Sequence, residues 1–390
     1  MELAFLSPLL DRPGPWASVY LETSRNTEDA AKQQELRERA AGEQLAAQGV
    51  DSATWAALRA HLAAEPVSRA PAGRALFATG GEVVLDLPLE TPPPAPETAW
   101  TALPHLSPLL RLRGEEYSCL VAYIDRTGAD IEVRDAQSRK PIGQAEGGQA
   151  EGRQWQGRGH RSVPADRYEW HYQHKVHDTW ERTAVIIADE IARCWRDSGA
   201  RMLVLAGDPR ERRAVHELLP QPLRQVAVEV EGAGRAAGSS PERLDRQIAQ
   251  VREDRARAHL DEALEQFRAG RGRPGEHGSL GPDTGPGEAA EGIPAVVDAA
   301  RRHQVATLLV QESAGDVERP LWVGPEPDQL AVRRAEAQTL GVAAPEQARA
   351  DDALLRSAIA AGAEALLVPD EVAGPAGGLG AILRWSDHPA

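Results

Sequence analysis

Residues Asp166–Gly207 read DRYEWHYQHKVHDTWERTAVIIADEIARCWRDSGARMLVLAG, a long helical pattern followed by a short apolar run. Apolar residues recur every three or four positions at Val176, Trp180, Ala184, Ile187 and Ile191. This spacing is that of one helix face, so we expect a helix from about Asp166 to Asp197. The run Met202–Gly207 is typical of a strand in a parallel sheet, buried on both faces. A long helix followed directly by such a strand predicts an α/β layer.

The residues on both sides of this stretch extend the α/β pattern. Ser118–Ile124 and Ala129–Val133 flank a short turn and predict a hairpin. After the apolar run, a helix and a further strand are expected within Arg210–Val230. Residues 135–164 are rich in Gly and Gln and have no periodicity, so we expect irregular chain there. Residues 114–234 are therefore predicted to form a middle α/β domain.

The residues before this domain mix strands and helices. Trp16–Leu21 is a β-rich run, and Thr27–Gln48 and Asp51–Ala63 have helical patterns. Within Ala75–Leu85, two apolar runs flank a glycine turn and predict a hairpin. Residues 1–113 are predicted to form a mixed α+β domain, and no motif of recognisable chemistry occurs in them.

Residues 241–390 alternate helices with short apolar runs, which predicts a third, layered α/β domain. A helix rich in Arg and Glu opens this segment. Gly270–Gly292 follows with eight glycines and three prolines, a composition that predicts a flexible surface loop. Beyond it, strands are expected at Ala306–Val310, Leu321–Gly324, Ala365–Pro369 and Gly380–Leu383.

The charge of the chain limits its nucleic-acid contacts. The formal net charge is −15, and a general nucleic-acid binder needs clustered cations to neutralise phosphates. Any RNA contact must therefore be local. The chain has no window long and apolar enough to span a membrane. Its two cysteines, Cys119 and Cys194, lie in apolar or helical stretches, which is typical of buried thiols. We expect a cytoplasmic protein with reduced cysteines.

One local cluster of cations stands out within residues 152–175. It has a net charge of +3 in this acidic chain, and histidines and aromatic rings are interleaved with the cations. Guanidinium groups neutralise phosphate and flat rings stack on unpaired bases, so this composition suits RNA. The alternative is a solvated helix face with scattered aromatics. The candidate RNA-binding residues are Arg153, Arg158, His160, Arg161, Arg167, Trp170, His171, His174 and Lys175.

A metal site in this region has incomplete support. His171, His174 and Asp178 fall at positions i, i+3 and i+7 of the expected helix. A structural zinc site needs four ligands, and no fourth is apparent. We therefore predict no metal and no cofactor.

The triplet Gly147-Gly148-Gln149 is the candidate catalytic element. Glycines give the backbone conformations closed to other residues, and a glutamine side chain can position a water beside an ester carbonyl. A tripeptide of such common residues is a weak motif when it stands alone.

The order of these elements resembles the bacterial branch of the archaeo-eukaryotic class I release factor and Pelota family. The resemblance covers nearly the whole chain. It rests most on Pro15–Tyr20, Leu103–Leu106, Asp178–Arg182, Leu321–Gly324 and Ala348–Leu354. It implies a ribosome-binding factor of the A site that contacts ribosomal RNA and tRNA. It also implies a C-terminal domain that engages elongation factor Tu or another translational GTPase.

One departure from the family bears on catalysis. Hydrolytic members have a Gly-Gly-Gln or related loop close before the long helix, where this chain has Ala165–Glu169 with neither glycines nor glutamine. The triplet Gly147–Gln149 lies well before that position, and we interpret it as coincidental. The resemblance then favours a non-catalytic hibernation or stress factor. A peptidyl-tRNA hydrolase for ribosome rescue is the alternative, and an α/β protein outside translation that binds another anion is a third.

Overall fold

The computed structural model describes residues 1–23, 30–63, 73–89, 91–115, 117–135, 139–146, 165–230, 241–271 and 289–385. Side chains of the long helix are described from Trp180 onward. The chain divides into two compact units. Unit 1 combines Met1–Glu115 with Ala256–Ala390, and unit 2 is Glu116–Arg255. The division into domains at 1–113, 114–234 and 241–390 stays a prediction.

Unit 2 is built on a mixed five-stranded sheet of order β7-β6-β5-β8-β9. The hairpin β5–β6 and the pair β6–β7 are antiparallel, while β5, β8 and β9 run parallel to one another. The strands are β5 (Cys119–Asp125), β6 (Gly128–Arg134), β7 (Arg139–Glu146), β8 (Met202–Gly207) and β9 (Ala227–Val230).

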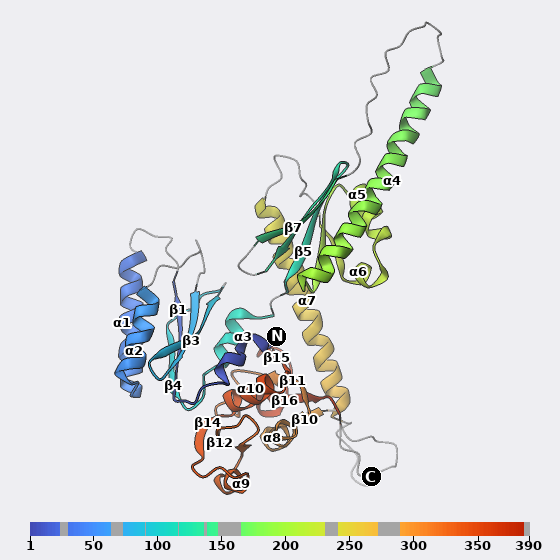
Figure 1. The fold of residues 1–390 in the computed structure, drawn as a ribbon. Coiled ribbons are helices and arrows are strands. Elements are labelled where there is room, and N and C mark those ends of the chain that lie inside the picture. The colour runs from blue at the N-terminus through green and yellow to red at the C-terminus, as the bar shows by residue number, and fades with distance from the viewer. Residues whose placement is uncertain are drawn as a thin grey trace, which may run out of the picture. The chain divides into compact units, whose positions relative to one another are not determined.

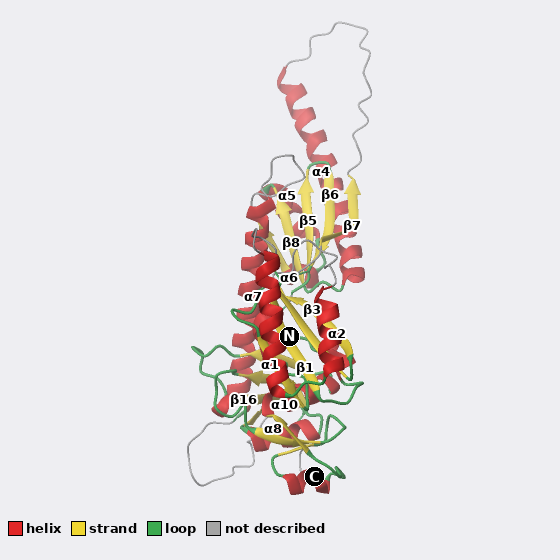
Figure 2. Cartoon of the chain, turned by 90° about the vertical axis from the view of Figure 1, so that its left-hand side faces the viewer, coloured by secondary structure: helices red, strands yellow, loops and turns green. Residues whose placement is uncertain are grey.

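Helices cover both faces of this sheet. One face packs through Leu120, Leu203 and Leu205 against α4 (Ala165–Ser198) and α5 (Pro209–Leu218). The opposite face carries Val121 and Val204, which pack against Leu244 and Ile248 of α7 (Pro241–Gly270). A short helix α6 (Gln221–Val226) precedes β9. The predicted α/β layer is confirmed, and α4 continues past the end of the sheet (Figure 1, Figure 2).

The expectation of irregular chain over residues 135–164 is wrong at β7. Its residues pair with β6 in antiparallel register from Arg134↔Arg139 to Gly128↔Glu146. The β7 residues are mostly polar, with only Ala145 buried. The strand lies at the edge of the sheet and buries few of its side chains, so it carries no apolar periodicity that could reveal it.

The N-terminal part of unit 1 is an antiparallel sheet of order β3-β2-β1-β4. Helices α1 (Ala30–Gln48) and α2 (Ser52–Ala63) cover one face of it (Figure 2). The strands are β1 (Trp16–Glu22), β2 (Gly73–Thr79), β3 (Glu82–Leu89) and β4 (Glu97–Thr101), and a 3-10 helix, η1 (Ala4–Leu9), precedes them. The expected strands and helices are present. In addition, the structure shows β4 and α3 (Ser107–Arg113), which the sequence did not predict.

The C-terminal part of unit 1 holds two sheets. The larger has the order β10-β16-β11-β15 and packs against α8 (Ile293–Arg301), α10 (Ala350–Ala360) and the last turns of α7. Its strands are β10 (Ala289–Glu291), β11 (Val305–Val310), β15 (Glu364–Leu367) and β16 (Leu379–Leu383). The smaller, β13-β12-β14, comprises β12 (Pro320–Val323), β13 (Leu330–Ala331) and β14 (Glu346–Arg349), with α9 (Arg334–Thr339) beside it. The strand expected at 321–324 therefore belongs to a separate small sheet.

A single apolar core joins the two parts of unit 1. Trp16, Tyr20 and Phe77 from the N-terminal sheet share this core with Leu354 and Leu355 of α10. β1 packs on both faces of its sheet because side chains alternate along a strand. Trp16 and Tyr20 pack into this core, while Val19 packs against α1 and α2. All of β1 except its last residue is buried.

The observed architecture confirms the mixed α/β fold class. Cys119 and Cys194 are buried free thiols in unit 2. Within the described residues, none of the helices has the length and apolarity needed to cross a membrane. Positions 272–288 of the predicted loop Gly270–Gly292 lie outside the described residues.

Leu58 and Leu36 provide a matched test of the N-terminal packing. Leu58 is fully buried between α2 and the sheet, whereas Leu36 on α1 is 58% exposed. We expect Leu58→Ala to lower the free energy of unfolding by about 2–5 kcal/mol, because the substitution leaves a cavity. Leu36→Ala removes the same atoms and should change it by less than about 0.5 kcal/mol. Urea unfolding followed by circular dichroism measures both, and equal losses would contradict this packing.

Candidate functional site

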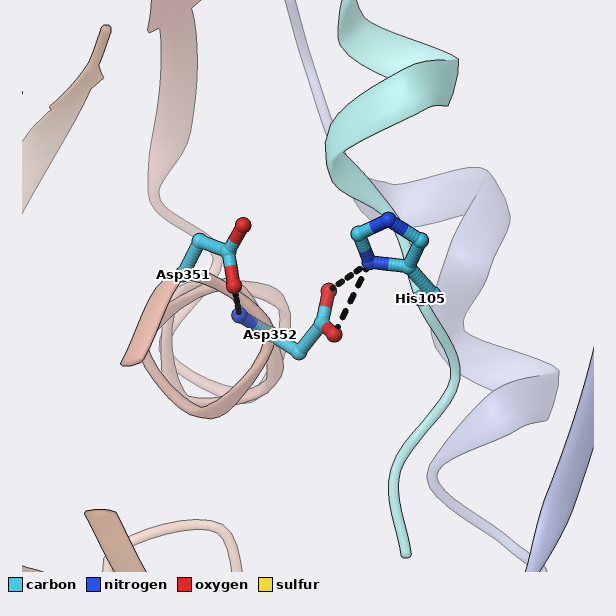
Figure 3. A group of neighbouring side chains, drawn as sticks. All are labelled: His105, Asp351 and Asp352. Carbon is cyan, nitrogen blue, oxygen red and sulfur yellow. Dashed lines mark hydrogen bonds and ion pairs between the residues drawn. The ribbon is translucent and has the colours of Figure 1, made fainter. Parts of the chain in front are cut away.

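Three of the stretches that carry the sequence resemblance meet in unit 1. The backbone N–H of His105 donates to Ser18 Oγ at 2.9 Å, and the hydroxyl of Tyr20 donates to the His105 carbonyl at 2.6 Å. These bonds tie the segment before α3 to β1. From the other side, the carboxylate of Asp352 faces the same histidine from α10 (Figure 3).

Asp352 contacts two groups of the segment before α3. Its oxygens lie 3.0 and 3.2 Å from His105 Nδ1, and Oδ1 accepts the backbone N–H of Leu106 at 2.8 Å. The Asp352 side chain is 1% exposed and that of His105 is 19% exposed. A carboxylate this deeply buried requires such partners, because desolvation otherwise disfavours its charge.

The neighbouring Asp351 is fully buried and has partners of its own. It accepts a hydrogen bond from the Ser107 hydroxyl at 2.6 Å. Arg349 donates to both of its oxygens, from Nη2 at 2.8 Å and from Nε at 3.1 Å. Asp351 Oδ1 also accepts the backbone N–H of Asp352, which fixes the first turn of α10 (Figure 3). Carboxylates near a helix N-terminus are favoured by the helix dipole.

The electrostatics of the cluster favour a charged histidine. Burial opposes protonation of His105, but the Asp352 carboxylate outweighs it, so the pKa of the imidazole lies above its ordinary value. Burial, helped by the charge of Asp352, raises the pKa of the Tyr20 hydroxyl well above its ordinary value. Tyr20 therefore acts as a neutral hydrogen-bond donor. Burial raises the pKa of the Asp352 carboxyl and the charge of His105 opposes that rise, so the buried pair is held by mutual attraction.

The geometry identifies a structural junction. A histidine held by a buried carboxylate can serve as a general base when a nucleophile lies beside it. The nearby Ser107 donates to Asp351 instead, so this cluster pairs no described hydroxyl with the His105 ring. The cluster thus fastens the segment before α3, and with it β1, to α10.

Two groups of described residues could in principle hold a metal ion. One is this cluster, and the other is Glu115, His259 and Glu364; in each the ligand atoms lie within 4.8 Å of one another. In both, the donors already have partners. In the first group, Arg349 donates to Asp351 and the Leu106 amide donates to Asp352. In the second group, His259 Nδ1 lies 2.8 Å from a carboxylate oxygen of Glu115. Neither arrangement requires a metal ion.

The structure does not locate the side chains of the residues predicted to bind RNA or to catalyse. Gly147, Gly148, Gln149, Arg153, Arg158, His160 and Arg161 lie outside the described residues. The remaining candidates lie in the first part of α4, where the helical backbone alone is described: Arg167, Trp170, His171, His174 and Lys175. Their proximity to one another stays a prediction.

The middle part of the chain matches the model of a known protein family. The model of the bacterial archaeo-eukaryotic release factor family 2 matches residues 118–273, which include the sheet of unit 2 and its long helix. This part of the chain is similar to the bacterial archaeo-eukaryotic release factor family 2. The resemblance deduced from the sequence is confirmed there.

Other similar proteins span nearly the whole chain. An uncharacterized protein of Mycobacterium tuberculosis is 28% identical over 386 residues, covering 97% of this chain and 95% of the relative. An archaeal translation termination factor is 16% identical, with 98% and 96% coverage and a TM-score of 0.24. Pelota of Archaeoglobus fulgidus is 14% identical, with 98% and 92% coverage and a TM-score of 0.32.

The junction around His105 was missed as a functional unit by sequence reasoning. Its members other than Ser107 lie within the stretches quoted for the resemblance, yet His105 and Asp352 are 247 positions apart. Periodicity reports neighbours along one element and cannot pair residues so distant. The available signal was the run Arg349-Ala350-Asp351-Asp352, because adjacent acids beside an arginine at a helix start indicate a capped, charge-paired terminus.

The raised pKa of His105 predicts a pH-dependent stability. A histidine whose pKa rises on folding stabilises fully below its unfolded pKa, about 6.5, and this contribution is lost as pH rises through the folded value. The free energy of unfolding should therefore fall as the pH is raised from about 6.5 through that value. Urea unfolding at a series of pH values measures the change.

His259 contributes a dependence of the same sign, since its hydrogen bond with Glu115 raises its pKa. The comparison of wild type with His105→Gln therefore isolates the junction. The variant should lose part of the pH dependence. An unchanged profile in His105→Gln would show that the pair with Asp352 does not stabilise the fold.

Proposed function

We propose that this protein is a ribosome-binding translation factor that occupies the A site without hydrolysing peptidyl-tRNA, as a hibernation or stress factor. The observation that carries the proposal is the family match over residues 118–273. An archaeal Pelota that is 16% identical to this chain has been described in a ribosome-bound form with ABCE1. The proposal extends that association to this chain.

Local charge supports an RNA contact by the same region. Residues 152–175 combine a net charge of +3 with four aromatic residues in a chain of −15. Their cations would neutralise phosphates, and their aromatic rings would stack on unpaired bases. The position of this cluster, between β7 and the described side chains of α4, puts it within the matched family region.

Charge reversal tests ribosome binding. Replacing Arg158, Arg161, Arg167 and Lys175 together with Glu should abolish co-sedimentation with ribosomes, because the RNA phosphates would then meet four acids. Wild-type binding should also weaken as salt is raised, since phosphate contacts release counterions. Sedimentation of purified protein with ribosomes at several salt concentrations measures both effects.

A control with the same change in net charge separates local contact from global charge. Arg59, Arg243, Arg319 and Arg333 are exposed on other elements, and their replacement by Glu should leave co-sedimentation largely intact. Circular dichroism confirms that both variants fold. Equal behaviour of the two quadruple variants would remove the basis for assigning RNA contact to residues 152–175.

A specific observation favours a second function, peptidyl-tRNA hydrolysis. β7 ends at Glu146, so Gly147-Gly148-Gln149 follows directly on an edge strand of the unit 2 sheet. Ester hydrolysis requires a positioned water and donors to the developing oxyanion, which a glycine-glutamine loop could supply. Asp166 and Glu169, at the position expected for the family's loop, could not donate to an oxyanion.

Peptide release distinguishes the two functions. We expect the purified protein to release little or no peptide from ribosome-bound peptidyl-tRNA, because the triplet lies far along the chain from α4. Release is measured as free labelled peptide over time, with Gln149→Ala and Gln144→Ala on β7 as matched variants. A rate above background that disappears in Gln149→Ala but not in Gln144→Ala would establish the hydrolase instead.

A translational GTPase such as elongation factor Tu is the proposed protein partner, engaged through residues 241–390. The test uses the full-length chain, because Trp16, Tyr20 and Phe77 complete the core of the C-terminal part. Pull-downs in both nucleotide states should retain the GTPase, and retention in neither would refute this partner.

A further inference from the structure

Unit 1 contains a cavity at the edge of the junction. Its volume is about 350 Å³, within the range of about 300–1,000 Å³ typical of ligand pockets. Leu103, Val323 and Ile359 contribute buried apolar surface to its lining. These residues come from the segment before α3, from β12 and from α10, so the cavity forms only when both parts of unit 1 are packed together.

One cation in the cavity has no acidic partner. Arg356 of α10 donates from Nη1 to the Gly324 carbonyl at 2.8 Å and from Nη2 to the Pro325 carbonyl. Among the described residues no carboxylate lies within ion-pair distance of it, and Glu326 and Asp328 act only from further away. Burial outweighs these acids and lowers the pKa of the guanidinium. A guanidinium has five N–H donors, so donors remain for a ligand.

Three other charged side chains line the cavity. Asp11 and Glu346 are exposed, and neither forms an ion pair with a described residue. Arg12, the second cation of the lining, is neutralised by Glu82 at 2.7 Å. The cavity therefore combines a half-buried, unpaired cation with two exposed, unpaired acids and an apolar wall.

We propose that this cavity binds a free amino acid with an apolar side chain. Arg356 would hold the α-carboxylate, since guanidinium and carboxylate match in geometry and charge. The carboxylates of Asp11 and Glu346 would attract the α-ammonium, and Leu103, Val323 and Ile359 would enclose the side chain. The two acids at the exposed side disfavour polyanions such as nucleotides, because like charges repel.

Isothermal titration calorimetry of the full chain with L-leucine tests the proposal without ribosomes, so its outcome is separate from that of the proposed function. L-leucine should bind with a measurable Kd. L-leucinamide lacks the carboxylate, and 4-methylpentanoate lacks the ammonium. Each analogue should bind about tenfold or more weakly, because each loses one charge-assisted hydrogen bond. Equal binding of either analogue would overturn the assignment of an amino acid.

Substitutions then locate the site. Arg356→Gln keeps a donor for the two backbone carbonyls but removes the charge, and should weaken leucine binding by about tenfold or more. Arg12→Gln removes the paired cation of the same lining and should leave the affinity within about twofold. Thermal unfolding shows whether each variant is folded. No binding of leucine to the wild-type chain, or unchanged binding to folded Arg356→Gln, would refute the site.

Discussion

The burial of the Asp352 carboxylate against His105 and the Leu106 amide is the constraint on which unit 1 depends. A carboxylate that is 1% exposed is tolerated only where its hydrogen-bonding capacity is satisfied. Its partners come from a segment 247 positions away, so they are in place only when the N-terminal sheet is docked on α10. The apolar core around Trp16 and Leu354 supplies most of the driving force, and the hydrogen bonds of Asp352 are satisfied in that docked arrangement.

This docking has consequences for surfaces away from the pair. The cavity beside the junction takes its walls from both parts of unit 1, and the guanidinium of Arg356 is positioned by backbone carbonyls that follow β12. A partner that binds the C-terminal part therefore meets a surface whose shape depends on residues 1–115. For this reason the N-terminal part has a structural role even though its sequence carries no recognisable chemistry.

In unit 2, the helix α4 differs in composition along its length. From Trp180 onward, α4 covers the sheet through Ala184, Ile187 and Ile191. The residues before Trp180 carry the cations and aromatics proposed to contact RNA. The packed half fixes the direction of the helix, and the fold thereby provides an anchored base for that segment. The family match over residues 118–273 covers both halves.

Periodicity along the chain was sufficient for elements whose burial repeats regularly. It predicted α4, β8 and the hairpin β5–β6, because apolar side chains recur there at helical or strand spacing. The stretches quoted for the resemblance indicated the family whose model matches residues 118–273. Tertiary structure alone decided the strands β4 and β7, whose residues are largely polar and whose pairing depends on a neighbouring strand. It alone also decided the pairing of His105 with Asp352, because contact between distant residues arises from packing and leaves no period in the sequence.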